Sequence, residues 1–340
     1  MTNFIYFILI LAVSNFFIFK FYKQISFKYN LYDIPDEKRK KQLKPIPLLG
    51  GVFFLFNFFS YFIFEYFFNQ KTFFHLLGFV GNKDILIFIV SVLIIFVIGY
   101  IDDKLKLKPI TKLLLLGIVC WVVFSTNSQI VINSLTFSFY SKPIDLFNLS
   151  ILFSILCVLC LINSINMLDG INLISGLYFL SVALVLIIYN YHVYFALMLI
   201  LSIIYFIKLN YNGKIFLGDS GIYIVSFLFA LIFIDFYEER NFSVERILLF
   251  MFLPMIDFFR LIIVRIYNKK HPFHADENHF HHILSKKFNY KIKVVLLIVF
   301  LYLPIILDYF FRNNELFIIA FMLIIYFSTL NLKLKKSKNE

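Results

Sequence analysis

The stretch ILIFIVSVLIIFVIGYI (residues 85–101), followed at once by Asp102-Asp103, decides the class of fold. It is long enough to cross most of a bilayer as a helix, because a hydrocarbon core of about 30 Å needs roughly 20 apolar residues. The two adjacent carboxylates that close it repel each other, and a lysine-rich segment from Lys104 to Lys112 follows. Such a pair binds a metal, holds a proton for chemistry, or ends the helix as a solvated cluster.

The composition is that of a membrane protein. Of the 340 residues, 61% are hydrophobic and only 15% are charged, and Phe alone fills 48 positions, which lies far outside the range of soluble domains. The first apolar run, Phe4–Phe19, has no basic residue ahead of it and no small-residue cleavage pattern behind it. We therefore expect an uncleaved first span and not a signal peptide.

Apolar runs recur along the whole chain and predict about eleven transmembrane helices. We place these spans at Phe4–Phe19, Leu48–Phe68, Ile85–Ile101, Leu113–Thr126, Leu146–Ile162, Leu173–Tyr189, His192–Ile207, Ile222–Phe236, Ile247–Ile266, Val294–Leu307 and Leu316–Leu330. With the N-terminus outside, 26 of the 32 Lys and Arg residues fall in inner segments and 6 in outer ones, as the positive-inside rule requires.

The sequence therefore predicts an all-α polytopic membrane protein with its C-terminus in the cytoplasm. We expect one membrane domain (residues 1–332) and a basic tail (residues 333–340). The net charge of +12 is explained by this topology, so we do not expect nucleic acid as a partner. In the outer segments, Asn127–Ser141 alternates weakly and favours a small hairpin. Cys157 and Cys160 lie in an apolar run, where packing is favoured over a metal or redox role.

Two polar motifs of the inner side follow in chain order. The motif Pro-x-Pro-x-x-Gly-Gly (residues 45–51) fixes a bend at which the backbone approaches a ligand closely, or its basic loop anchors the chain to anionic lipid. Asn163, Asn166 and Asp169 are spaced by three, so on a helix they would share one face before Gly170 permits a break. Capping of two helix ends is the alternative for this turn.

A third motif, Phe-x-Gly-Asp-Ser-Gly (residues 216–221), leads directly into a span. At a helix start, backbone N–H groups can bind an anion, and the Asp219 carboxylate can bind the metal ion that accompanies this anion. Alternatively, Asp219 is an ordinary N-cap. Further along, Asp257 and Arg260 are three residues apart inside a span, and a structural ion pair is the favoured interpretation.

Five of the seven histidines fall in residues 271–282. Asp276, His279 and His282 have helical spacing, which is compatible with zinc. No cysteine is near, however, and imidazoles bind phosphate equally well.

Taken together, these motifs resemble those of the polyprenyl-phosphate N-acetylhexosamine-1-phosphate transferase family. The resemblance spans nearly the whole chain and rests on Asp-x-Pro, Pro-x-Pro-x-x-Gly-Gly, Asp102-Asp103 with Lys112, Asn-x-x-Asn-x-x-Asp-Gly, Phe-x-Gly-Asp-Ser-Gly, the Pro254–Arg260 segment and Asp-x-x-His-x-His-His. It implies transfer of a sugar 1-phosphate from a UDP-N-acetylhexosamine to undecaprenyl phosphate with release of UMP, at the cytoplasmic face of a bacterial inner membrane. It also implies Mg²⁺, for which Mn²⁺ could substitute, and leaves a homodimer open.

The resemblance assigns roles to single residues. Asp219 is the expected metal ligand, while Asp102 and Asp103 either deprotonate and orient the lipid phosphate or help to bind the metal. The groups expected to hold pyrophosphate oxygens are Lys112, His279, His281 and His282. The groups expected at the nucleotide sugar are Asn163, Asn166, Asp169 and Asn172.

One departure from the family concerns Asn172, where many relatives carry a second Asp. Asn still accepts a hydrogen bond, so we expect a change in uracil contact or sugar choice and not a loss of activity. The chain also lacks the longer inserts of the peptidoglycan enzyme, which points to an initiator of O-antigen, capsule or a similar surface glycan.

Two other classes of function use parts of the same sequence. A transporter or ion pathway could use the intramembrane pair Asp257 and Arg260, but the polar groups gather at the inner ends of spans and we expect nothing comparable at the outer end. A non-catalytic scaffold for glycan assembly would leave Asp102, Asp103 and Asp219 without a purpose.

Overall fold

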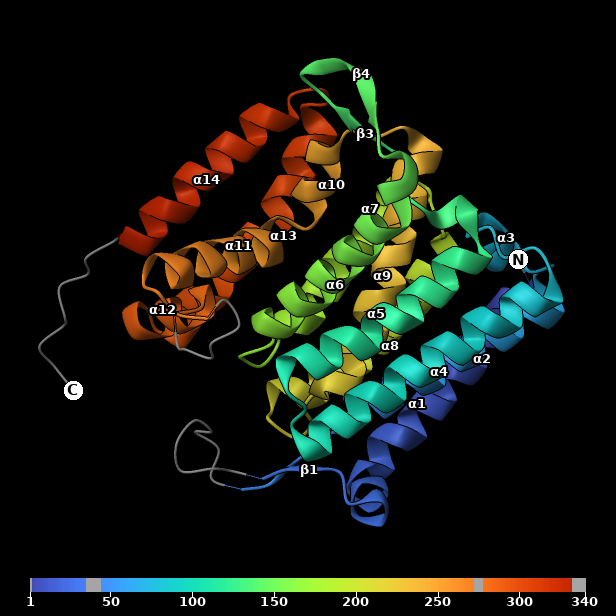
Figure 1. Cartoon of the computed structure of the whole chain (residues 1–340). Coiled ribbons are helices and arrows are strands. Elements are labelled where there is room, and N and C mark those ends of the chain that lie inside the picture. Colours follow the sequence, from blue (N-terminus) through green and yellow to red (C-terminus); the bar gives the residue numbers. More distant parts are fainter. Residues whose placement is uncertain (1, 35–43, 272–277, 332–340) are drawn as a thin grey trace, which may run out of the picture.

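The computed structural model describes residues 2–34, 44–271 and 278–331 (Figure 1), so the predicted basic tail lies outside the described residues. Within these ranges the fold consists almost entirely of helices. The helices are α1 (Thr2–Tyr29), α2 (Gly50–Phe68), α3 (Thr72–Leu76), α4 (Asn82–Leu105), α5 (Pro109–Thr126), α6 (Ser150–Leu168), α7 (Ile174–Ile188), α8 (Val193–Tyr211), α9 (Gly218–Arg240), α10 (Val244–Phe250), α11 (Phe252–Tyr267), α12 (Phe280–Lys287), α13 (Tyr290–Phe310) and α14 (Glu315–Asn331).

The predicted all-α membrane class is confirmed. In the described part of the chain, eight helices are long and apolar enough to cross a membrane, and α10 with α11 makes a ninth if the bent pair is one span. Two further apolar helices, α7 and α14, are shorter. Each of the eleven predicted spans therefore coincides with a helix or a broken helix, while the number of crossings and the orientation of the termini stay predictions.

Helix α9 lies at the centre of the bundle (Figure 1). All of its apolar span is buried, and α2, α4 and α6 pack directly against it. The sequence explains this position, because the helix is apolar on every side from Ile222 to Ile234 and a helix of that kind is an enclosed one. The bundle is thus built around the helix whose second residue is Asp219.

The prediction of one continuous span over Ile247–Ile266 is wrong. The chain forms α10 and α11 here, and the two helices meet near Met251 at a bend of 97°. Pro254 accounts for the break, since a proline is tolerated in the first turn of a helix but not in its interior. The bend gives the bundle an additional helix start just before Asp257.

Two short antiparallel strand pairs complete the described fold. Strand β1 (Tyr32–Asp33) pairs with β2 (Ile46–Pro47), and β3 (Ser134–Phe137) pairs with β4 (Tyr140–Asp145). The second pair is the hairpin predicted for this region, displaced toward the C-terminus, and its external position stays a prediction. The alternating residues 130–132 do not join it because they are buried against the helices.

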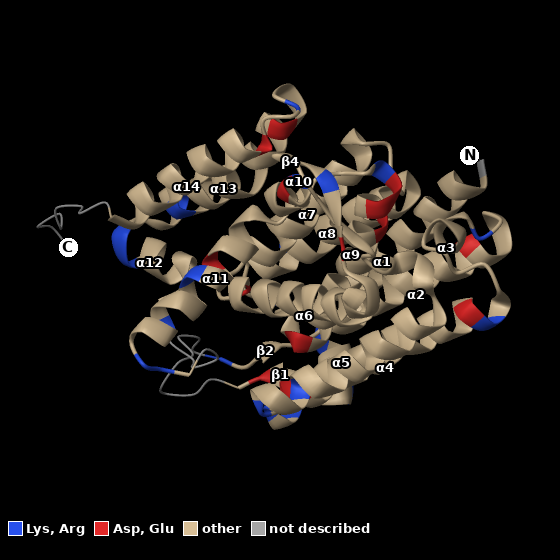
Figure 2. Cartoon of the chain, turned by 45° about the horizontal axis from the view of Figure 1, so that its top comes forward, with Lys and Arg blue, Asp and Glu red and all other residues tan. Residues whose placement is uncertain are grey.

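Charged residues lie mostly near the ends of the helices (Figure 2). The expectation that the end remote from Asp219 holds no comparable cluster is wrong. Arg246 Nε lies 3.1 Å from Asp308 Oδ1, and the same guanidinium contacts Glu315. Both carboxylates are almost fully buried. These partners come from three separate helices, so each looks like an isolated charge in the sequence.

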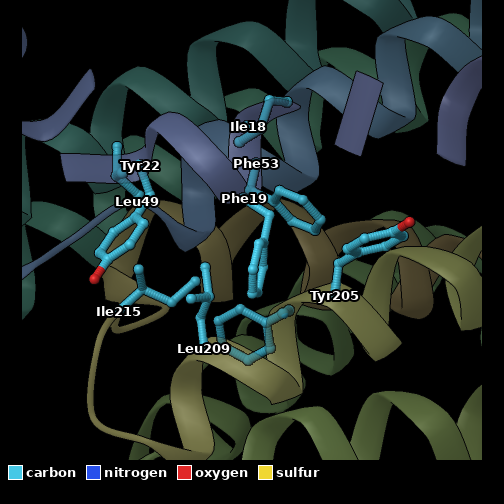
Figure 3. Close-up of a pocket in the computed structure, with 9 residues that line it drawn as sticks. Ile18, Phe19, Tyr22, Leu49, Phe53, Tyr205, Leu209 and Ile215 are labelled. Atoms are coloured by element: carbon cyan, nitrogen blue, oxygen red, sulfur yellow. The ribbon is translucent and has the colours of Figure 1, made fainter. Parts of the chain in front are cut away.

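A small cavity between α1, α2 and α8 is shown in Figure 3. Its volume is about 10 Å³, which is room for no more than one water. Its lining is apolar apart from two tyrosines and consists of Ile18, Phe19, Tyr22, Leu49, Phe53, Tyr205, Phe206, Leu209 and Ile215. This cavity is a feature of helix packing and cannot hold a substrate.

Candidate active site

The predicted aspartate pair lies at the C-terminal end of α4. Asp102 is 2% exposed, and its Oδ1 accepts a hydrogen bond from Leu107 N at 2.9 Å. Its Oδ2 lies 3.1 Å from Lys112 Nζ and also accepts the hydroxyl hydrogen bond of Tyr223. Asp102 therefore joins α4 to α5 and α9, with both carboxylate oxygens engaged. Tyr223 was not predicted, although it lies four residues after Asp219 and thus on the same helix face.

The side chain of Asp103 binds the N-terminus of α9. Its Oδ1 accepts from Asp219 N at 2.7 Å, and its Oδ2 accepts from Ser220 N at 3.1 Å and from Ser220 Oγ at 2.9 Å. A carboxylate in this place satisfies free N–H groups of the first helical turn and the positive end of the helix dipole. Asp103 thus acts as a cap for a helix that begins more than 100 residues later.

Helices α4 and α9 meet backbone to backbone because residue 99, in α4, is glycine. A Cβ atom on Gly99 would lie 2.7 Å from Ser220 N, and one on Gly51 would lie 2.8 Å from Ser220 Cβ. The predicted close approach at the paired glycines is therefore to protein and not to a ligand. Phe216 N donates to the Pro47 carbonyl at 2.8 Å in the same contact.

Asp219 faces the end of α6. Its Oδ1 accepts a hydrogen bond from Asn166 Nδ2 at 2.6 Å, and Asp102, Lys112 and Lys106 are in electrostatic contact with it. The structure therefore brings Asp102, Asp103, Lys112, Asn166 and Asp219 together, although they come from four helices.

Asp169 is the residue directly after α6, and it feels the charges of Asp219 and Asp103. Burial raises the pKa of the Asp169 carboxyl to about 7, and the negative charges of Asp219 and Asp103 add to the rise. The turn after it is held by Asn210, whose Oδ1 accepts from Leu173 N at 2.6 Å. Leu173 has a φ of 78°, which is unusual for a residue with a side chain and marks a constrained turn. Asn210 was missed because it lies in the apolar helix α8.

Asn163 and Asn172 are less closely tied to these residues. Asn163 Nδ2 donates to Leu159 O of its own helix at 2.7 Å, so the expected common face for Asn163, Asn166 and Asp169 is not reflected in shared contacts. The Nδ2 of Asn172 lies beside Gly213, on the loop after α8.

The histidine segment reaches the α6–α7 turn through α12. His281 is almost fully buried and packs on Gly170, where a Cβ atom would lie 2.5 Å from His281 Cε1. Burial, and then the neighbouring His282 and His279 rings, lowers the pKa of the His281 imidazole to about 3. His281 is therefore neutral and can offer one donor and one acceptor. Asp276, the remaining member of the zinc hypothesis, lies outside the described residues.

The lowered pKa of His281 predicts an acid-sensitive stability. Below pH 6.5 the His281 imidazole binds a proton in the unfolded chain but stays neutral in the folded chain. The free energy of unfolding therefore falls as the pH drops from 6.5 toward 3, by about 1.4 kcal/mol per pH unit at most. We expect His281→Gln to show a smaller decrease in Tm between pH 7.5 and 5.5 than the wild type, measured by thermal unfolding in detergent. His75→Gln, at an exposed histidine of α3, is the control. Equal decreases in all three proteins would contradict the prediction.

The donor atoms of the site are compatible with Mg²⁺. Among residues 2–34, 44–271 and 278–331, no three His, Cys, Asp or Glu side chains form a ready metal site. Mg²⁺ does not need one, because it is usually held by one or two carboxylates together with waters and substrate phosphates. Asp219 Oδ2 accepts no hydrogen bond from the described residues, whereas both oxygens of Asp102 and Asp103 are engaged. These donor atoms fit a magnesium ion, which Asp219 would hold together with a phosphorylated ligand.

The bundle and its charged end are those of a multi-pass membrane protein, and comparison with known proteins shows what the chain is similar to. Residues 85–237 match the model of glycosyl transferase family 4, a range that runs from α4 to α9 and contains Asp102, Asp103 and Asp219. The match confirms the resemblance that the motifs indicate.

Two relatives extend the similarity beyond that range. The chain is 27% identical to the undecaprenyl-phosphate alpha-N-acetylglucosaminyl 1-phosphate transferase of Thermotoga maritima, over 85% of this chain and 84% of the relative. It is 23% identical to the protein of the same name from Escherichia coli K12, over 78% of this chain and 72% of the relative.

Proposed function

We propose that the chain transfers N-acetylhexosamine 1-phosphate from a UDP-sugar to undecaprenyl phosphate and releases UMP. The observation that carries this proposal is the meeting of Asp102, Asp103 and Asp219 with Lys112 at one end of an apolar bundle. The names of the two relatives support it, since both are undecaprenyl-phosphate N-acetylglucosaminyl 1-phosphate transferases. A site between two polyanions needs cations and a metal, and these residues can supply both.

In the proposed reaction, an oxygen of the lipid phosphate attacks the phosphorus that carries the sugar. The P–O bond to the uridine-bearing phosphate breaks, and UMP leaves with its electron pair. One phosphoanhydride is exchanged for another, so the reaction is nearly reversible. Mg²⁺ at Asp219, or Mn²⁺ in its place, would neutralise phosphate charge, and Lys112 adds a positive group from α5.

We assign different roles to the two adjacent aspartates. Asp103 positions Asp219, because its carboxylate holds the backbone N–H of Asp219 itself. Asp102 forms an ion pair with the Lys112 ammonium. We place its carboxylate beside the acceptor phosphate, where it orients the attacking oxygen. Neither role requires Asp102 or Asp103 to bind the metal.

The donor lies, in this proposal, between the α6–α7 turn and α12. Asn166 in the last turn of α6 and Asp169 directly after it face Asp219. The histidines at the start of α12, His279, His281 and His282, would hold pyrophosphate oxygens. Because His281 is neutral, it contributes a hydrogen bond and not a charge. Asn163 and Asn172 would contact the nucleotide sugar further out.

The acceptor's long apolar chain requires a separate groove, and the structure contains a candidate. A cavity of about 390 Å³ lies between α6, α9, α10 and α11. Its wall is almost entirely apolar and includes Leu161, Ala230, Phe233, Met251 and Met255. We propose that this cavity receives part of the prenyl chain, which would enter sideways from the bilayer.

Filling this cavity tests the assignment. Ala230→Phe adds a ring to its wall and should raise the KM for undecaprenyl phosphate about tenfold, while a short-chain prenyl phosphate loses little, because only the long chain needs the space. The measurement is UMP release at varied acceptor concentration. Ala320→Phe, on an exposed position of α14, is the matched control. Equal losses for the long and the short acceptor would contradict a role in chain binding.

The decisive test of the function is an assay in vesicles that contain the protein, Mg²⁺ and undecaprenyl phosphate. A panel of UDP-sugars is added, and the exchange of labelled UMP is followed. We expect exchange with at least one UDP-N-acetylhexosamine, and its absence with every donor would refute the proposal.

The cellular setting is part of the proposal. The Lys and Arg asymmetry supports a site at the cytoplasmic face of the membrane, and the bacterial relatives support a bacterial inner membrane. The glycan that begins with this step would be an O-antigen, capsule or similar surface polymer.

A further inference from the structure

Another buried polar cluster lies at Asp257 on α11, apart from Asp102, Asp103 and Asp219. Its carboxylate is 3% exposed and meets groups from three elements: Arg260 of the same helix, Tyr326 of α14 and the N-terminus of α12. We call this cluster the Asp257 junction. The predicted ion pair is confirmed, with Arg260 Nη2 at 2.6 Å from Asp257 Oδ1, but the pair forms only one part of the junction.

The junction fixes the start of α12. Phe280 N donates to Asp257 Oδ1 at 3.2 Å and to Oδ2 at 3.1 Å, and His279 Nδ1 lies 3.6 Å from Oδ2. Arg260 Nη2 in turn donates to the carbonyl of Asn278 at 2.6 Å. The N-cap residue of α12, His279, makes no side-chain cap of its own, so Asp257 takes over that function from another helix.

Helix α14 contributes to the same junction. Tyr326 is fully buried, and its hydroxyl lies 2.8 Å from Asp257 Oδ1 and 2.9 Å from Arg260 Nε. Its ring stacks on Phe280, with centroids 4.7 Å apart. An eight-residue helix is not stable alone, so α12 depends on these contacts for its place. That place matters because His281, one residue after Phe280, packs on Gly170 beside Asp169.

We propose that Asp257 is a positioning residue for the reaction. Together with Arg260 and Tyr326 it holds α12 so that the histidines face the α6–α7 turn. The proposal rests on the proposed function for its catalytic consequence, since the histidines are placed there at the donor pyrophosphate. It gives a catalytic purpose to α14, which contributes Tyr326 to the junction.

Two variants and one control test the proposal. Asp257→Asn keeps the shape but removes the charge that faces Arg260, and Tyr326→Phe removes one hydroxyl and keeps the ring. Tyr302→Phe is the matched control, because Tyr302 is also a tyrosine that donates one hydrogen bond, to Leu177 O at 2.9 Å on α7. Each protein is examined by UMP exchange and by hydrogen–deuterium exchange of α12.

We expect Asp257→Asn to lower kcat/KM for the UDP-sugar about 10- to 100-fold, as loss of a group that orients a functional residue commonly does. The KM for undecaprenyl phosphate should change less than about threefold. Amide exchange in residues 278–287 should be about tenfold faster, because the bonds that hold the helix start are weakened. Tyr326→Phe should show the same pattern at smaller size, and Tyr302→Phe should match the wild type.

Unchanged amide exchange in Asp257→Asn would overturn the proposal, and so would faster exchange with unchanged kinetics. Losses of equal size in Tyr302→Phe would also overturn it, because they would show a general sensitivity to buried hydroxyls. A wild type that is inactive with every UDP-sugar would refute the proposed function instead, and amide exchange would still decide whether Asp257 holds α12.

Discussion

Asp219→Asn is expected to reduce turnover by about 10³-fold, equivalent to roughly 4 kcal/mol. The three predicted metal ligands are Asp102, Asp103 and Asp219. Among their carboxylate oxygens, Oδ2 of Asp219 alone accepts no hydrogen bond from the described residues. An amide in its place keeps the bond to Asn166 in shape but removes the negative charge that would hold Mg²⁺. The residual activity should therefore need a higher Mg²⁺ concentration for its half-maximal value. Both quantities are measured by UMP exchange in vesicles.

The control for this variant is Asp84→Asn. Asp84 also lies in the first turn of an apolar helix, α4, where its carboxylate accepts from Gly81 N at 3.2 Å. Activity close to that of the wild type is expected there. If Asp219→Asn retained turnover within about threefold of the wild type, the assignment of the metal to Asp219 would be wrong.

Gly99→Ala is expected to lower both turnover and stability, although it adds a single methyl group. The new Cβ would lie 2.7 Å from Ser220 N, and backbone cannot rotate away as a side chain can. Helices α4 and α9 would have to separate, which moves Asp103 from its bonds at the start of α9. A displacement of about 1 Å at a reacting site can lower the rate about 10²-fold, and overpacking costs about 1–3 kcal/mol of stability. Thermal unfolding and UMP exchange measure the two effects.

Gly117→Ala provides the matched comparison. Gly117 lies in α5, and a Cβ there would meet only Leu159 Cδ1, at 3.8 Å. The same substitution should therefore leave turnover unchanged. Similar losses at Gly99 and Gly117 would mean that helix flexibility, and not the contact with Ser220, explains the effect.

Hydropathy predicted the helices well because membrane insertion is decided by local composition. It failed at Met251, where α10 and α11 bend by 97°, since hydrophobicity does not register the direction of a helix. Pro254 was visible, but a proline inside an apolar run allows a kink of any size. The eleven predicted spans thus gave the order of the elements and not their geometry.

The candidate site was partly predictable because polar residues at the ends of apolar runs stand out. Asp102, Asp103, Asn166 and Asp219 were found in this way and lie together. A spacing of three rotates successive residues by about 60° on a helix, so Asn163 lies about 120° from Asp169 and makes different contacts. Partners such as Tyr223 and Tyr326 look ordinary in the sequence, since their importance arises from contacts with distant helices.

The enclosure of α9 has a consequence for how the protein is made. A segment that is apolar all round is accepted by the bilayer before its neighbours arrive, yet in the finished bundle it touches only protein. The transfer of α9 from lipid into the bundle gives no hydrophobic stabilisation, because lipid tails are as apolar as the bundle. The attraction comes instead from close packing of α9 against small residues such as Gly51 and Gly99. Until that contact forms, Asp219 on α9 stays apart from Asp102 and Asp103 on α4. A half-assembled chain is therefore inert, and catalytic competence arrives only with completed biogenesis.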